Sequence, residues 1–294
     1  MKPLLGLRAH DFGPKPAEQL APSIAASGAA CVQLALAKAL PEGHLWPSDF
    51  KPGELEQIRG HFDKNGLSIA VLGCYIDMVT PDDQARELEL QRFEAHVAMA
   101  GRLNCTIVGT ETGSPDPYLH HPDGREQAFQ VALAGIQRLS KAAEAQSGVR
   151  VGLEPVAETH AVASATHARR VLDHVNSPAL GIIFDPVNLV PPKGLDSMEA
   201  FLDECFDAFG DKIIALHAKD FVMDSIAGSP RKRDNLPAGT GVMDWVGVFT
   251  RLIKAGKQHV PILLEDAGPD SAALAFTNLR AAWLQAEEHL SANP

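Results

Sequence analysis

Four short apolar runs in the second half of this sequence each end in a side chain that can bind a metal ion. Three runs end in carboxylates, at Glu154, Asp185 and Glu265, and the run IIALH ends at His217. Singly, such a carboxylate could cap the next helix, and such a histidine could be a hydrogen-bonded core residue. Together, three converging carboxylates would repel one another and raise their pKa values unless a cation were bound. The pattern therefore predicts a divalent-cation site made of these four residues.

The chemistry of this predicted site follows from its donor atoms. Three carboxylates and one imidazole suit Mn²⁺ or Mg²⁺ best, with Co²⁺ or Zn²⁺ as alternatives, and no cysteine joins the set. Such a cation can hold two neighbouring oxygens of a hydroxy-ketone, polarise the carbonyl, and stabilise the enediolate formed when a C–H proton leaves. Glu154 and Glu265, on opposite sides of the cation, could each exchange that proton, so we predict them as the catalytic acid/base pair.

Regular alternation of strand-like and helix-like segments predicts the frame that positions these residues. The strand-like runs are 4–10, 29–36, 67–75, 105–111, 149–154, 180–185, 212–219 and 260–265. The helical segments are 14–27, 53–65, 81–103, 125–146, 161–175, 196–210, 244–256 and 270–290. Eight such βα units in 294 residues predict an α/β fold, a single (β/α)8 TIM barrel spanning residues 1–294. An open doubly wound sheet is the alternative, but the turn HDFGPKP after the first run lacks its usual GxGxxG. Residues 221–241 are expected to form a long loop.

Side chains on a strand alternate between its two faces, which predicts what lines the barrel interior. In the run 212–219, His217 should point inward and Ile214 outward. The same alternation turns Arg8, His10 and Gln33 inward, toward the carboxyl-end mouth where barrel active sites lie. The strand-end residues His10, Gln33 and Glu111 are therefore predicted to contact substrate, with Tyr75 beside them.

Composition narrows the classes of partner. The formal net charge of −11 disfavours nucleic acid, and the three cations at 231–233 are either a phosphate site or a solvated run. The start of the chain lacks the apolar stretch of a signal peptide, and no segment is long and apolar enough for a membrane helix. The four cysteines form no CxxC motif, as expected for buried free thiols in a reducing compartment. We therefore expect a cytoplasmic protein with neither nucleic acid nor membrane as a partner.

The order and spacing of five segments resemble one family across nearly the whole chain. These are GLEP at Glu154, FDPVN at Asp185, LHAKD at His217, AGTGVMDW after it, and LLED at Glu265. The chain resembles the xylose isomerase-like TIM barrel superfamily of sugar (phosphate) isomerases and epimerases, to which AP endonuclease 2-like barrels also belong. The resemblance implies a metal-dependent isomerase or epimerase of a small sugar, keto-sugar or sugar phosphate, in a family where homo-oligomers are common.

The resemblance also implies roles for individual residues. It assigns metal ligation to the four residues above, acid/base exchange to two of them, Glu154 and Glu265, and substrate contacts to His160, Asn188 and Lys219. Lys219 could instead be a solvated loop lysine. Asn188 departs from the ketose epimerases of the family, which carry histidine at that place.

Three other functions remain open on the sequence. A lyase or dehydratase in the same barrel would use the same proton abstraction to expel a leaving group from an inosose, a keto-sugar or dehydroshikimate. An apurinic-site endonuclease would need further metal ligands, for which Glu111 is a candidate. A metal-free binding protein predicts that the four candidate ligands do not converge in space.

Overall fold

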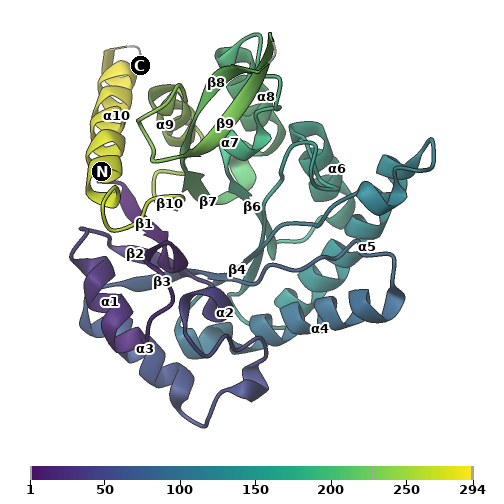
Figure 1. Cartoon of the computed structure of the whole chain (residues 1–294), viewed down its shortest axis with the longest axis vertical. Helices are drawn as coiled ribbons and strands as arrows, with labels where there is room; N and C mark the ends of the chain where they lie inside the picture. The colour runs from purple at the N-terminus through teal and green to yellow at the C-terminus, as the bar shows by residue number, and fades with distance from the viewer. Residues whose placement is uncertain (1, 227, 293–294) are drawn as a thin grey trace.

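Eight parallel strands close into a barrel in the computed structural model, which describes residues 2–226 and 228–292 (Figure 1). Around the barrel the strands follow the order β1, β2, β3, β4, β5, β6, β7 and β10, with β10 returning to pair with β1. Their bounds are β1 Leu4–Arg8, β2 Cys31–Leu34, β3 Ser68–Gly73, β4 Ile107–Thr110, β5 Arg150–Leu153, β6 Leu180–Phe184, β7 Ile213–Ala218 and β10 Pro261–Leu264. The predicted (β/α)8 TIM barrel is confirmed.

Helices connect the strands and surround the barrel (Figure 1). The α-helices are α1 Ala17–Ala25, α2 Leu36–Ala39, α3 Glu54–Lys64, α4 Asp83–Met99, α5 Gly124–Glu144, α6 Ala165–Val175, α7 Pro186–Leu189, α8 Met198–Phe209, α9 Trp245–Lys254 and α10 Ala272–Ala292. Short 3₁₀ helices are η1 Ala9–Phe12, η2 Pro47–Asp49, η3 Ala100–Leu103, η4 Asp116–Tyr118 and η5 Gly210–Lys212. In the part of the chain described, no helix combines the length and the apolar character needed to cross a bilayer.

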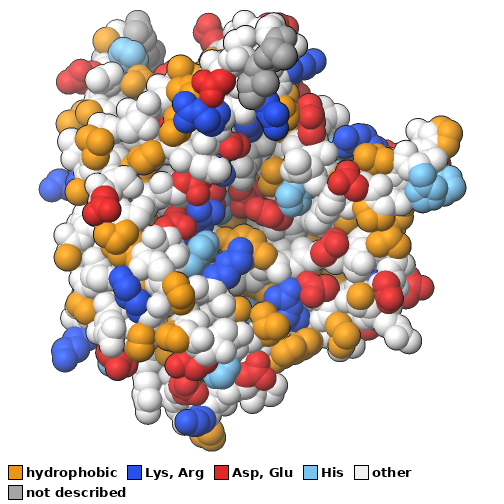
Figure 2. Space-filling model, in the orientation of Figure 1, with side chains coloured by type: hydrophobic (Ala, Val, Ile, Leu, Met, Phe, Trp, Pro, Cys, Tyr) orange, Lys and Arg blue, Asp and Glu red, His pale blue; other side chains and the backbone are white. Residues whose placement is uncertain are grey.

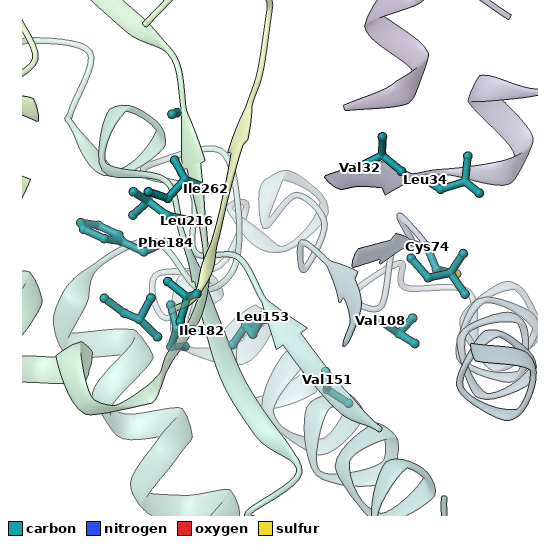
Figure 3. Close-up of a cluster of buried hydrophobic side chains, with 14 of the residues drawn as sticks. Val32, Leu34, Cys74, Val108, Val151, Leu153, Ile182, Phe184, Leu216 and Ile262 are labelled. Carbon is teal, nitrogen blue, oxygen red and sulfur yellow. The ribbon is translucent and has the colours of Figure 1, made fainter. Parts of the chain in front are cut away.

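The alternation of strand side chains divides the core into two layers. Outward-facing residues such as Ile182, Phe184 and Leu216 pack between the strands and the helices, and Figure 3 shows part of this layer. The inner layer fills the barrel with Cys31, Val71, Ile107, Ile183, Ile214, Ala215 and Leu263. Fully burying an aliphatic or aromatic side chain of this size contributes about 1.5–3 kcal/mol, so both layers hold the strand ends in place.

Ile214 lies in the inner layer, so its predicted outward orientation is wrong. The pairing of β6 with β7 shifts register between Ile182 and Ile183, which face Ile213 and Ala215, and Ile214 is the extra residue. Such a bulge changes the face to which a side chain points. Gly181 on the neighbouring strand β6 leaves space for the Ile214 side chain, because a Cβ at position 181 would lie 2.5 Å from Cγ2 of Ile214.

The segment 221–241 is not the predicted long loop. Strands β8 (Asp220–Ile226) and β9 (Ser229–Leu236) form an antiparallel hairpin outside the barrel (Figure 1). The sequence does not indicate this hairpin, because SPRKRDNL carries polar side chains on both faces and lacks the apolar alternation of a half-buried strand. The buried Asp220 carboxylate fixes the base of the hairpin by accepting hydrogen bonds from the backbone amides of Phe221, Gly239 and Met243.

Candidate metal centre

The four predicted ligands come together at the carboxyl ends of their strands. Glu154 directly follows β5, Asp185 directly follows β6, Glu265 directly follows β10, and His217 is the penultimate residue of β7. One donor atom from each of them lies within 4.8 Å of every other, and all four side chains are buried. The alternative of a metal-free binding protein predicted that these four residues do not converge in space, and the structure contradicts that prediction. Figure 2 shows acidic, basic and histidine side chains gathered at the hollowed centre of the surface.

Two donor atoms in this cluster are buried without a hydrogen bond. Asp185 caps α7 through Oδ1, which accepts from the backbone amide of Asn188 at 3.0 Å, while Oδ2 has no hydrogen-bond partner among the described residues. Nδ1 of His217 is likewise without one there, although Oε2 of Glu154 and Oε1 of Glu265 each lie 3.1 Å away. A buried polar atom left unsatisfied costs about 1–3 kcal/mol. The donor set and these free atoms fit a divalent cation, with Asp185 serving as both helix cap and candidate ligand.

Two cations contact the carboxylates of the cluster. The buried Lys219 donates from Nζ to Oε2 of Glu265 at 3.0 Å and lies 3.4 Å from Oδ2 of Asp185. Nη1 of Arg8 lies 3.1 Å from Oε1 of Glu265, and its Nη2 donates to Oδ1 of Asp266 at 2.9 Å. Lys219 is therefore not a solvated loop lysine. Arg8 was predicted only to face inward, and its contact with Glu265 adds it to the site.

The two candidate acid/base residues have different surroundings. Burial raises the pKa of Glu154, and His217 offsets this only in part. Burial would also raise the pKa of Glu265, but His217, Lys219 and Arg8 together lower it. Burial alone would lower the pKa of His217, whereas the two glutamates raise it to about 9. Glu154 thus meets one basic side chain, that of His217, whereas Glu265 meets three, those of His217, Lys219 and Arg8.

Asn188 contacts a candidate ligand directly. Its side-chain amide donates from Nδ2 to Oε1 of Glu154 at 2.7 Å, so Glu154 is held on one oxygen and faces His217 with the other. The sequence predicted Asn188 as a substrate contact. In the structure its side chain contacts Glu154, and a contact between Asn188 and the substrate stays a prediction.

The other predicted substrate contacts form two groups. Gln33, buried on β2, lies against His217, with Oε1 2.8 Å from Nε2 of the ring, and donates from Nε2 to the hydroxyl of Tyr75 at 2.6 Å. The ring of His10 meets that of Tyr75 edge-on at 6.4 Å, and burial with Arg8 and Lys38 nearby lowers the pKa of His10 to about 4.

The second group is Glu111 and His160. Nε2 of His160 lies 3.0 Å from Oε2 of Glu111, and the imidazole pulls the pKa of that carboxyl down although burial opposes it. Both side chains are partly exposed, at 18% for His160 and 32% for Glu111. They form an accessible pair following β4 and β5.

Two of the three cations at 231–233 contact different groups of the protein. Arg233 donates to Asp224 across the hairpin, and Lys232 donates from Nζ to the backbone carbonyls of Val187 and Val190. Lys232 therefore ties the hairpin to α7, the helix that Asp185 caps. These contacts favour a structural role for the run over a common phosphate site.

Comparison with known proteins places the chain in a family. The family model described as xylose isomerase-like TIM barrel matches residues 22–290. The chain belongs to this family. No curated protein matches it in a sequence search.

Solved structures of this family and of sugar epimerases share the fold. A D-tagatose 3-epimerase-like protein has a TM-score of 0.75 at 16% identity, over 99% of this chain and all of that one (100%). The apo form of 3-keto-D-glucoside 4-epimerase from E. coli has a TM-score of 0.72 at 14% identity, over 95% and 100%. A xylose isomerase-like TIM barrel protein from Mycobacterium smegmatis, in complex with magnesium, has a TM-score of 0.72 at 17% identity, over 97% of each chain. A fusion of such a barrel with 4-hydroxyphenylpyruvate dioxygenase matches at 0.71 and 19%, over 98% of this chain and 44% of its own length.

Proposed function

We propose that this family member is a divalent-metal-dependent epimerase or isomerase of a small sugar or keto-sugar. One observation carries the proposal: two buried glutamates, Glu154 and Glu265, each lie 3.1 Å from the same nitrogen of His217, within a four-residue cluster that could hold a cation. Sugar epimerases among the structures of the same fold support the choice of substrate class. Mn²⁺ or Mg²⁺ suits the oxygen-rich donor set best.

The four clustered side chains would hold the cation, which supplies Lewis acidity that polarises a substrate carbonyl and stabilises an enediolate. This chain's own residues then move the proton. One glutamate takes the proton from the carbon beside the carbonyl, and the other returns a proton to the opposite face, which inverts that carbon. Asn188 orients Glu154 through Oε1, while Lys219 and Arg8 hold Glu265, so each carboxylate keeps a fixed direction during the exchange.

Residues at the mouth are suited to bind hydroxyl groups. The accessible pair of His160 and Glu111 offers a ring nitrogen and carboxylate oxygens beside the cluster. Tyr75 and His10 lie on the other side, next to Gln33. Hydrogen-bond donors and acceptors of this kind recognise polyol oxygens, and we propose both groups as substrate contacts.

The pair of His160 and Glu111 also favours a second candidate, a lyase or dehydratase. A carboxylate-backed imidazole at the mouth could give a proton to a departing hydroxyl after the same C–H proton is removed. Both candidates share the first proton transfer and differ in whether the leaving group departs.

Exchange in D₂O tests the proposal. The Mn²⁺-loaded protein is incubated with a panel of keto-sugars and inososes, beside the variants Glu154→Gln and Glu265→Gln. We expect deuterium to enter the carbon next to the carbonyl with an epimeric product, and each variant to lose at least about 100-fold of that rate. Loss of water from the substrate would instead establish the dehydratase. Absence of exchange on the whole panel, with metal bound, would contradict both.

A further inference from the structure

Gln33 is the buried neighbour of His217 on the side away from the carboxylates. Its side chain is 1% exposed, and Oε1 lies 2.8 Å from Nε2 of the histidine ring. The other ring nitrogen, Nδ1, faces Glu154 and Glu265. The two nitrogens of one imidazole therefore meet different surroundings: an amide on one side and the candidate cation site on the other.

Hydrogen-bonding capacity gives this contact a direction. An amide oxygen only accepts, so the nitrogen of His217 that faces it carries the hydrogen. In a neutral imidazole the hydrogen on Nε2 leaves the lone pair on Nδ1, the nitrogen that faces the cluster. The amide nitrogen of Gln33 is used separately, since it donates to the hydroxyl of Tyr75 at 2.6 Å. Gln33 is thus held from its far end with its oxygen aimed at the ring.

We propose that Gln33 is a positioning residue that fixes the tautomer and orientation of His217, so that Nδ1 presents its lone pair to the cation. This inference deepens the proposed function and rests on the divalent-cation site described above. Histidines that bind metals usually donate their second ring hydrogen to a neighbouring acceptor, and removing that acceptor typically weakens metal binding by about 10–100-fold. In this protein the acceptor comes from β2, which β1 and β10 separate from β7 around the barrel, so the contact ties the site to the first half of the chain.

The same geometry makes Tyr75 the residue that holds the far end of Gln33. Because its hydroxyl oxygen accepts from Gln33, its own hydrogen is available to another acceptor. The ring is also covered by Nζ of Lys38, 4.0 Å from the centroid. A Tyr75→Phe variant would leave the buried amide nitrogen of Gln33 without its acceptor, so the matched control is taken outside the site: Gln57→Leu makes the same change on the exposed side of α3.

The test uses three variants and two readouts. Gln33→Leu removes the acceptor with little change in volume, Gln33→Glu keeps an acceptor, and Gln57→Leu is the control. The first readout is Mn²⁺ affinity by calorimetric titration. The second is the pattern of ¹⁵N–¹H couplings of the His217 ring in the protein loaded with diamagnetic Zn²⁺, in which a ligating ring is neutral, assigned by comparison with His217→Gln. Urea unfolding of each variant shows whether the fold is retained.

We expect Gln33→Leu to weaken Mn²⁺ binding about 10–100-fold, and Gln33→Glu and Gln57→Leu to stay within a few-fold of wild type. In wild type the ring spectrum should show a hydrogen on Nε2. A folded Gln33→Leu variant with wild-type Mn²⁺ affinity would overturn the proposal, as would a neutral ring with its hydrogen on Nδ1. If wild type binds Mn²⁺ but exchanges no substrate proton, the function fails and the positioning role stands. If wild type binds no cation, the role fails with the site.

Discussion

Asn188 holds Glu154: its side-chain amide donates to Oε1 at 2.7 Å, while its backbone amide donates to Oδ1 of Asp185 at 3.0 Å. One residue of the short helix α7 therefore fixes two candidate ligands that come from neighbouring strands. Both glutamate and aspartate keep a second oxygen for the cluster, since Oε2 of Glu154 faces His217 and Oδ2 of Asp185 accepts no hydrogen bond from the residues that the structure describes.

Replacing Asn188 should therefore affect the site more than the fold. In Asn188→Ala the backbone donor to Asp185 remains and only the bond to Glu154 is lost. We expect the substrate proton-exchange rate to fall at least about 10-fold, because Glu154 loses its orientation. We expect the free energy of unfolding to change by no more than about 1–3 kcal/mol, the range for a hydrogen bond to a charged group. Isotope exchange and urea unfolding measure the two effects, and an unchanged exchange rate would contradict the assignment of Asn188.

Lys219 and a bound cation should compete for the same carboxylates. Lys219 lies at 3.0 Å from Glu265 and 3.4 Å from Asp185, both buried. In Lys219→Met the metal-free protein keeps these charges without their partner, and we expect it to lose about 3–5 kcal/mol of stability. Added Mn²⁺ should then stabilise the variant more than it stabilises wild type.

Thermal unfolding with and without Mn²⁺ measures that difference for Lys219. The control is Lys254→Met, which removes a lysine in the last turn of α9. Equal Mn²⁺-induced shifts in Tm for wild type and Lys219→Met would show that lysine and cation act on different groups.

The cysteines should make the protein sensitive to alkali. Burial raises the pKa of Cys31 and Cys74 to about 12 and that of Cys105 to about 11. The pKa of a cysteine thiol in the unfolded chain is about 8.5. Above that pH the unfolded state therefore binds fewer protons than the native state. Stability is therefore fully present below about pH 8.5 and falls as the pH rises toward about 12, by at most about 1.4 kcal/mol per thiol and pH unit.

Urea unfolding at pH 7, 8.5 and 10 tests this effect, with Cys74→Ala expected to show a shallower loss between pH 8.5 and 10. Reaction with a thiol reagent gives an independent check, because all four cysteines are buried and free. We expect no fast-reacting thiol in the native protein and four in urea. Rapid labelling of the native protein would show that the thiols are accessible.

Asp220 should hold the hairpin rather than the barrel. Its buried carboxylate accepts from three backbone amides, those of Phe221, Gly239 and Met243. In Asp220→Ala these donors lose their partner, and we expect faster amide exchange across β8 and β9 than in wild type. Hydrogen exchange followed by mass spectrometry measures it, with the barrel strands as the internal reference. Equal acceleration in β5 and β6 would mean that Asp220 stabilises the whole fold.

The sequence predicted those features that depend on local patterns. The barrel strands are short apolar runs that stop at a polar side chain, so both the strands and the clustering of Glu154, Asp185, His217 and Glu265 could be expected. The hairpin could not be predicted, because β9 is largely exposed and lacks the apolar alternation of a half-buried strand. The position of Ile214 depends on a bulge, and the contacts of Asn188 depend on the turn of α7, neither of which has a signal in residue type alone.

Metal content is the measurement that tests the central claim most directly. Purified wild type is dialysed against Mn²⁺ and then against metal-free buffer, and the bound ion is counted by elemental analysis. The variants are Glu265→Gln, within the cluster, and Glu56→Gln, an exposed glutamate paired with Arg102 on the surface. We predict about one ion per chain in wild type and Glu56→Gln, and a large loss in Glu265→Gln. No bound ion in wild type, or equal binding by Glu265→Gln, would contradict the account.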